Sequence, residues 1–334
     1  MTNKRTFIPW LVPLIGLFGA LAAVPSCAQD AGRTTSPAPG LFTYHRTDAA
    51  PGGITQIHIN AGHTAPWTIQ QNIFGNFLEH LGNVVYGGVW ADALHNPNLE
   101  KVDDRDTEPQ WWDVKGSAAW QEGGYLSPRC VRLSGTDGTL LQRIFLPVHR
   151  TRRFTGTLYA RALGETAQIT LALQGMDNRA GQTFATVSLP VSGAEWQRKV
   201  FHFKLRADAP TKGDQEQFTI SHGTGGPVDV DQVTLFPDDA VDGLDPDVIR
   251  TARAWHIPIL RMAGNFSSGY HWQDGVGPRE RRPTLRNQAW GGVESNEFGT
   301  DEFLDFAHRI GAPVQIAVNA GSGTAEEAAG WVQY

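Results

Sequence analysis

The sequence is poor in cysteine and in clustered positive charge. Its 334 residues include only two cysteines, Cys27 and Cys130, and 28 Lys and Arg against 34 Asp and Glu. Two cysteines allow at most one disulfide within the chain, so the fold must be held mainly by packing. Phosphate binding needs clustered Lys and Arg, and the sequence has no such stripe, so a nucleic-acid partner is not predicted.

Two kinds of catalytic or metal-binding pattern are also missing. The histidines show no paired metal-ligand spacing, and no Gly-x-Ser-x-Gly elbow of an esterase occurs. We therefore expect no cofactor. A structural Ca²⁺ on acidic residues is one interpretation, and solvated strand and loop faces are the other. The residues concerned are Asp229, Asp231, Asp238 and Asp239.

The chain is rich enough in apolar residues to fold. It is 40% hydrophobic and 19% charged, which is typical of a globular protein, and it contains eleven tryptophans. Tryptophan suits stacking on sugar rings, although core packing explains many of them equally well. Trp111, Trp112 and Trp120 form either a sugar platform or a hydrophobic seam between two parts of the fold.

The N-terminus has the pattern of an export signal. Lys4 and Arg5 precede a largely apolar stretch over 7–24, and small residues follow up to Ala28. We expect cleavage after residue 28 and a secreted or periplasmic protein, with lipoprotein anchoring at Cys27 as the alternative. Proline interrupts the apolar stretch, so no membrane span is expected. After cleavage Cys130 is the one remaining cysteine.

The rest of the chain divides by its rhythm. Residues 29–52 are predicted to be a flexible leader, and 53–92 to contain a first barrel strand over 69–79. Short strands separated by turn residues predict an inserted antiparallel β-sandwich of the jelly-roll kind over 93–238. Residues 239–334 then alternate helix with buried strand, with strands at 257–260 and 313–318. This α/β order predicts a parallel sheet, either barrel or open.

The helix signals after the sandwich are specific. Asp245 with Pro246 predicts one start, and a second helix is expected from Thr300 to Gly311. Thr324 with Glu327 forms a capping box for a third helix. The first helix is expected to bury one face, made of Val248, Ala252 and Trp255.

Polar residues follow each predicted parallel strand. Glu79, Asn265 and Asn319 come just after the three apolar runs. Ligands of parallel α/β folds bind at the carboxyl ends of strands, so these side chains are expected to lie at one rim. A carboxylate and two amides suit a ligand with several hydroxyls, although a structural role is equally open for each.

Several longer motifs resemble a known family. Residues 75–82, 86–90, 260–272, 289–294 and 296–300 look like the α-L-arabinofuranosidases of glycoside hydrolase family 51, and they occur in the right order. The resemblance implies a (β/α)8 barrel and hydrolysis with retention by two glutamates. It also implies that Glu79 and Asn265 hydrogen-bond the arabinofuranosyl hydroxyls, with Trp290 on a loop beside the pocket. The sequence departs from the family at 262–264.

By the same resemblance, the acid/base and nucleophile glutamates close later strands. We therefore expect both catalytic glutamates to lie beyond Tyr334, and we expect this chain alone to be inactive. Asn296-Glu297 mimics the acid/base dipeptide but stands in a loop. The predicted partner is an arabinose-containing polysaccharide or oligosaccharide. The alternatives are an endoglucanase, a β-xylosidase, or a non-catalytic carbohydrate-binding protein.

Overall fold

The computed structural model describes residues 62, 64, 66–103, 105–208 and 210–334. The chain divides into two units, Met1–Ile69 and Gln70–Tyr334, and the helices and strands that the structure describes lie in the second unit. The predicted signal peptide, leader and Cys27 lie outside the described residues. Within the described part of the chain, no helix is long and apolar enough to cross a membrane.

A parallel three-stranded sheet carries the predicted barrel strands. Its order is β1 (Asn76–Leu78), β12 (Leu260–Met262) and β15 (Val314–Ile316). Each strand is shorter than predicted, because a strand extends only as far as its neighbour pairs with it. Residues Gln71–Phe74, predicted to continue the first strand, instead form the 3-10 helix η1, and Phe74 is exposed.

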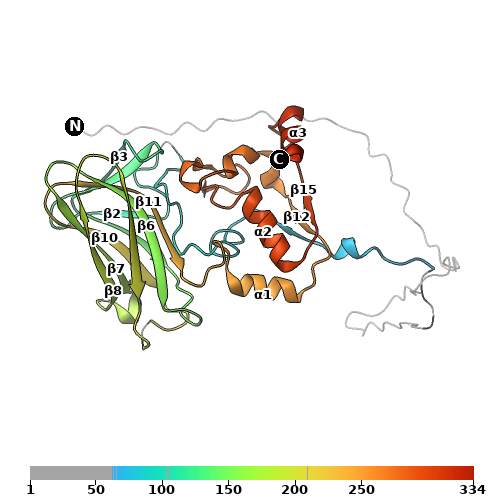
Figure 1. Cartoon of the computed structure of the whole chain (residues 1–334), viewed down its shortest axis with the longest axis horizontal. Helices are drawn as coiled ribbons and strands as arrows, with labels where there is room; N and C mark the ends of the chain where they lie inside the picture. The colour runs from blue at the N-terminus through green and yellow to red at the C-terminus, as the bar shows by residue number, and fades with distance from the viewer. Residues whose placement is uncertain (1–61, 63, 65, 104, 209) are drawn as a thin grey trace, which may run out of the picture. The chain divides into compact units, whose positions relative to one another are not determined.

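Three helices accompany this sheet (Figure 1): α1 (Pro246–Ala254), α2 (Thr300–Ile310) and α3 (Ala325–Gln333). The predicted starts are confirmed for α1, where Asp245 accepts hydrogen bonds from two backbone amides, and for α3, where Thr324 accepts one from Glu327. The predicted inner face of α1 is wrong at Trp255, which lies at the C-cap with 66% of its surface exposed.

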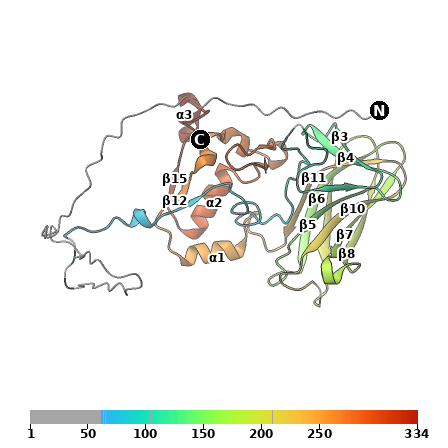
Figure 2. The same ribbon diagram turned by 180° about the vertical axis from the view of Figure 1, so that it is seen from behind.

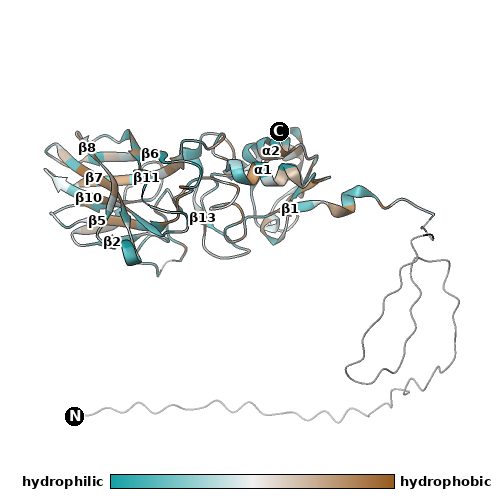
Figure 3. Cartoon of the chain, turned by 90° about the horizontal axis from the view of Figure 1, so that it is seen from below, coloured by the Kyte–Doolittle hydropathy of each residue, from teal (hydrophilic) through white to brown (hydrophobic). Residues whose placement is uncertain are grey.

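The predicted β-sandwich consists of two antiparallel sheets, seen from both sides in Figures 1 and 2. Buried residues alternate with more exposed ones along strands such as β6 and β8, and the buried side chains fill the space between the sheets. Brown apolar positions recur along these strands in Figure 3. One sheet has the order β2 (Asp113–Lys115), β5 (Thr139–Ile144), β10 (Glu216–Thr224), β7 (Ala167–Gly175), β8 (Thr183–Val191). The other has the order β3 (Ala118–Glu122), β4 (Arg129–Leu133), β11 (Val228–Pro237), β6 (Arg153–Ala162), β9 (Gln197–Lys204).

The remaining elements are short and lie mostly between β12 and α2. They are the 3-10 helices η2 (Asp177–Arg179), η3 (Asn265–Ser268), η4 (Trp272–Gly275) and η5 (Arg279–Arg281), and the hairpin strands β13 (Leu285–Arg286) and β14 (Val293–Glu294).

Two separate hydrophobic cores hold these parts. One lies inside the sandwich and is built from residues between Leu94 and Leu235. The other lies between the parallel sheet and the helices, where Phe303 and Phe306 of α2 are buried.

A narrow neck joins the two ends of the sandwich segment. The Ala91 amide donates to the Gly243 carbonyl at 2.8 Å, and the Asp245 amide donates to the Val89 carbonyl at 2.9 Å. Gly243 has a φ of 91°, and a Cβ there would lie 2.2 Å from the Trp90 ring. Glycine is therefore required for this close crossing.

Candidate functional site

The parallel sheet brings the predicted residues to one rim. Leu78 pairs with Met262, and Met262 pairs with Ile316, so the three strands end in register. Glu79 follows β1 directly, whereas Asn265 and Asn319 each stand three residues past the end of their strand. The carboxyl ends of the strands thus form the rim at which α/β folds bind ligands.

Glu79 is held by two donors from different segments. Its Oε1 accepts a hydrogen bond from the Phe266 amide at 2.9 Å and another from the Trp290 indole Nε1 at 2.8 Å. The side chain is 4% exposed, while 44% of Trp290 is exposed. The structure therefore places Trp290 beside Glu79. Asn265 directly precedes Phe266, whose amide binds the same oxygen of Glu79.

Gly264 makes room for this carboxylate. It has a φ of 112°, and a Cβ built there would lie 2.0 Å from Glu79 Cδ. Both the backbone angle and the space demand glycine. The motif departs from its family pattern at 262–264, yet it keeps glycine directly before Asn265.

Asn287 positions the loop that carries Trp290. Its Oδ1 accepts from the Trp290 amide at 3.0 Å, and its Nδ2 donates to the His80 carbonyl at 2.9 Å. This buried amide therefore ties the Trp290 loop to the residue after Glu79. Asn287 was not predicted as a site residue, although its position three residues before Trp290 is a signal for such an amide.

A buried polar network lies beneath Glu79. His80 Nδ1 lies 2.8 Å from Glu294 Oε2, and the Tyr86 hydroxyl donates to Glu294. The His80 ring stacks on Phe266 with centroids 4.4 Å apart. Burial raises the pKa of Tyr86 well above its usual value, so this hydroxyl stays protonated and donates. None of these residues was predicted, although each falls within a motif that carries the resemblance.

A cleft of about 560 Å³ opens at the same rim. Its lining includes Asn265, Ser268, His271, Arg286, Gln288 and Ser322. Asn265 is exposed there, whereas Glu79 and Trp290 do not line this cleft. Amide, hydroxyl and guanidinium groups offer directional hydrogen bonds, so the cleft suits a ligand with several hydroxyls.

Asn319 is occupied by its own loop. Its Oδ1 accepts from the Gly321 and Ser322 amides, each at 3.0 Å, and its Nδ2 donates to the Tyr270 carbonyl at 3.1 Å. The side chain is 6% exposed and does not contact Glu79. Its hydrogen-bonding groups shape the loop after β15, and substrate binding by Asn319 stays a prediction.

Glu297 lies apart from this rim. It sits in the loop between β14 and α2, as predicted, and is 5% exposed. Burial raises its pKa to about 7, and the Ser295 hydroxyl donates to it at 3.2 Å. Glu297 lines a separate cleft of about 220 Å³, together with Tyr159 and Arg198 of the sandwich.

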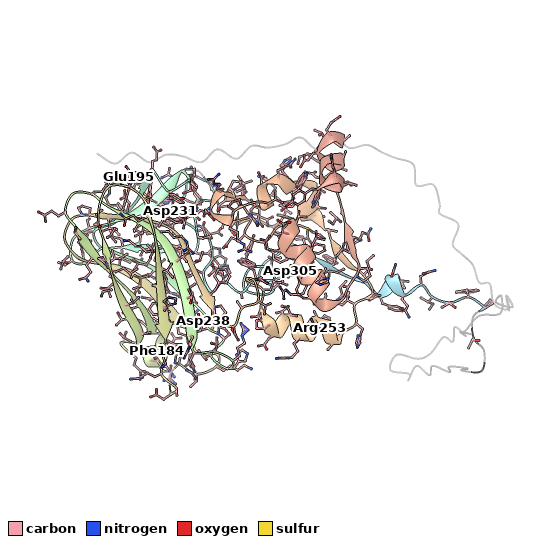
Figure 4. All side chains as sticks on the ribbon, viewed as in Figure 1. Phe184, Glu195, Asp231, Asp238, Arg253 and Asp305 are labelled. Carbon is pink, nitrogen blue, oxygen red and sulfur yellow. The ribbon has the colours of Figure 1, made fainter. Side chains whose placement is uncertain are left out.

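Two of the four aspartates considered for Ca²⁺ do not lie on solvated faces. Asp229 and Asp231 are fully buried, and Asp229 pairs with Arg132 and Arg161. Asp231 lies within β11, whereas Asp238 follows the end of this strand and lies apart from it (Figure 4). Across the part of the chain that the structure describes, no group of three or more His, Cys, Asp or Glu is suited to a metal ion.

Comparison with known proteins identifies the second half of this site. Residues 253–331 match the family model of the "Alpha-L-arabinofuranosidase 1 domain". The chain is 44% identical over 94 residues to "Alpha-L-arabinofuranosidase C" of Emericella nidulans, covering 28% of this chain and 19% of that protein. It is also 44% identical over 96 residues to "Intracellular exo-alpha-L-arabinofuranosidase" of Bacteroides ovatus, with the same coverage. The chain thus spans about a fifth of the length of these relatives.

The fold agrees with this result. An arabinose-bound family 51 α-L-arabinofuranosidase superimposes with a TM-score of 0.63 at 21% identity, covering 78% of this chain and 47% of that one. The parallel sheet and the inserted sandwich therefore share their fold with that structure. Residues 253–331 are thus similar to the domain of the α-L-arabinofuranosidases, and the chain is similar to a part of these enzymes.

Proposed function

We propose that this chain is part of a retaining exo-glycosidase that releases terminal α-L-arabinofuranosyl residues from arabinoxylan, arabinan or their oligosaccharides. The observation that carries the proposal is the carboxylate of Glu79, fixed by the Phe266 amide and the Trp290 indole at the rim of the parallel sheet. This rim belongs to a chain that is 44% identical to named arabinofuranosidases over 94 residues.

We assign separate tasks to the rim residues. Both donors to Glu79 bind Oε1, and no donor among the described residues binds Oε2. Oε2 can thus accept a hydrogen bond from a sugar hydroxyl. Asn265 would supply an amide from the adjoining cleft, and the exposed part of Trp290 would cover one side of the sugar. Such bonds accelerate hydrolysis when they strengthen as positive charge develops on the sugar ring.

We place the acid/base and the nucleophile on strands beyond those described. Retaining hydrolysis needs two carboxyl groups about 5 Å apart across the scissile bond. Among the described residues, Glu79 is the carboxylate at the rim that Trp290 contacts. Glu297, the other glutamate considered, lines a different cleft. The activity therefore belongs to a protein of the relatives' full length. We also propose export to the periplasm or the medium, from the charged and apolar pattern over 4–28.

The test compares two proteins on a panel of chromogenic glycosides. One is the 334-residue chain, and the other is a longer protein in which the remaining barrel strands follow residue 334. We expect the longer protein to hydrolyse p-nitrophenyl α-L-arabinofuranoside with retention, and the shorter chain to show no turnover. Turnover only on xylosides or glucans would instead support the β-xylosidase or endoglucanase alternative. Polysaccharide binding without any hydrolysis would support a non-catalytic protein.

A further inference from the structure

A third cleft, distinct from those at Asn265 and Glu297, opens beside the sandwich. Its volume is about 690 Å³, and it shares no lining residue with the cleft at Asn265. Two of its walls are the aromatic rings of Trp111 and Phe145, which are 54% and 63% exposed. A concave site of several hundred Å³ is typical of ligand pockets, and large exposed apolar rings in such a site mark an interaction surface.

The Trp111 ring is held in place without a ligand. It stacks on His95 with ring centroids 4.8 Å apart and planes 25° apart. The His95 amide donates to Gln142 Oε1 at 2.8 Å, and its carbonyl accepts from Gln142 Nε2 and Trp112 Nε1, each at 3.0 Å. Because Gln142 is buried on β5, this stack is anchored to the sandwich.

The backbone of Trp111 is strained. Its φ is 76°, a conformation that costs free energy for a residue with a Cβ. Such strain persists where surrounding contacts fix it, and it is concentrated at functional sites. Here the strain keeps a large ring exposed in the cleft instead of letting it pack inward as its neighbour Trp112 does.

The cleft also carries unpaired positive charge. Arg143 and Lys212 line it, and neither side chain has an ion-pair partner among the described residues. The neighbouring Arg150 differs, because it is already paired with Asp245 at 2.8 Å. Three carboxylates line the same wall. Asp245 is paired with Arg150, and burial raises the pKa of Asp92 well above its usual value, so neither offsets the two cations. Asp113, which is half-buried, is the third, and one such carboxylate against two cations leaves the wall with an excess of positive charge.

We propose that this cleft is a second carbohydrate-binding site, which holds an acidic polysaccharide by stacking a sugar ring on Trp111 and pairing a uronate carboxylate with Arg143 and Lys212. Aromatic faces bind the apolar face of a sugar ring, and the guanidinium fork matches a carboxylate. The choice of a sugar as ligand rests on the proposed function. The site itself requires no catalysis, so a failed hydrolysis assay and a failed binding assay are separate results.

The test measures binding of the 334-residue chain to glucuronoxylan by affinity electrophoresis and calorimetry. The matched probe is the same polymer with its carboxyl groups reduced to alcohols. We expect binding that weakens with added salt and is roughly tenfold weaker for the reduced polymer. Trp111→Ala and Arg143→Gln should each weaken binding to glucuronoxylan by roughly tenfold. Two control variants change residues outside the cleft lining. Trp255→Ala removes a ring that is 66% exposed, and Lys204→Gln removes an exposed cation. Both should bind like the wild type.

Equal binding of the native and reduced polymers would overturn the proposal, as would absence of binding to either. Unchanged affinity of Arg143→Gln would overturn it as well. Circular dichroism checks that each variant is folded. If Trp111→Ala does not fold, Arg143→Gln decides the outcome, because Arg143 is an exposed residue of β5 whose loss removes no packing.

Discussion

At the scale of single residues, Glu79 shows how a buried carboxylate is fixed without a cation. Its two hydrogen-bond partners are a backbone amide and an indole, both neutral donors. Neither donor carries a formal charge, so neither compensates the carboxylate as the cation of an ion pair would. The site is thus suited to stabilising positive charge on a bound sugar.

Changing Glu79 to Gln should separate charge from structure. Gln keeps an oxygen that accepts from Phe266 and Trp290, so the melting temperature should stay near that of the wild type. Activity of the longer protein on arabinofuranosides should fall by about 10² or more, because losing one charged hydrogen bond in the transition state costs roughly 2–4 kcal/mol. Steady-state kinetics measure this loss, and unchanged activity would give Glu79 a purely structural role.

Changing Gly264 to Ala should damage the same site through the backbone. The new Cβ would meet the Glu79 carboxyl group and would also require a positive φ, so we expect a loss of about 2 kcal/mol or more in stability. Urea unfolding measures this loss. Gly269→Ala is the matched control, since its φ is −125° and its nearest contact is 3.6 Å. Equal stability of the two variants would contradict the steric argument.

The sequence predicted part of this site for an identifiable reason. Glu79 and Asn265 follow apolar runs, and Trp290 lies in a motif that resembles the family, so local pattern was enough to select them. The partners of Glu294 were not predictable in this way. His80 and Tyr86 reach Glu294 across more than 200 positions of sequence, and only the folded chain brings them together.

At the scale of elements, the starts of the helices were predicted better than the ends of the strands. A helix start is encoded locally by its cap, as Asp245 and Thr324 show. A strand's length is set by its neighbour, so the predicted run over 69–79 pairs only over Asn76–Leu78. Likewise the length of β10 depends on its neighbours β5 and β7, with which it pairs in the centre of its sheet.

Strand β10 carries an acid that makes stability depend on pH. Glu216 is fully buried, and burial raises its pKa from 4.5 to about 8. Asp214 nearby raises it further, and Arg179 lowers it. Between these pH values the folded state binds more protons than the unfolded state, so stability should fall as pH rises from about 4.5 to about 8.

The variant Glu216→Gln should remove this fall. Gln resembles the protonated acid and does not titrate, so we expect it to be about 1–3 kcal/mol more stable than wild type near pH 8.5, with little difference near pH 4.5. Urea unfolding at the two pH values measures the effect. Glu195→Gln, at an exposed position of the sandwich, is the control. An unchanged pH slope in Glu216→Gln would contradict the prediction.

At the scale of the whole molecule, the two hydrophobic cores predict independent folding of the sandwich. The sandwich core draws only on residues between Leu94 and Leu235, and the other core is built from residues on either side of that segment. Residues 93–238 expressed alone should therefore give a β-type circular dichroism spectrum and a cooperative melt. A product without cooperative unfolding would show that the two cores depend on each other.

The neck between Ala91 and Gly243 has a kinetic consequence. Strands β1 and β12 must pair although the whole sandwich lies between them in sequence, and closing so long an unfolded loop is slow. Once the sandwich has folded, the neck holds its two ends a single hydrogen bond apart, so only short segments remain to be closed. The folded sandwich thus keeps its two ends close together, and the rim that carries Glu79 should assemble only after the sandwich has folded.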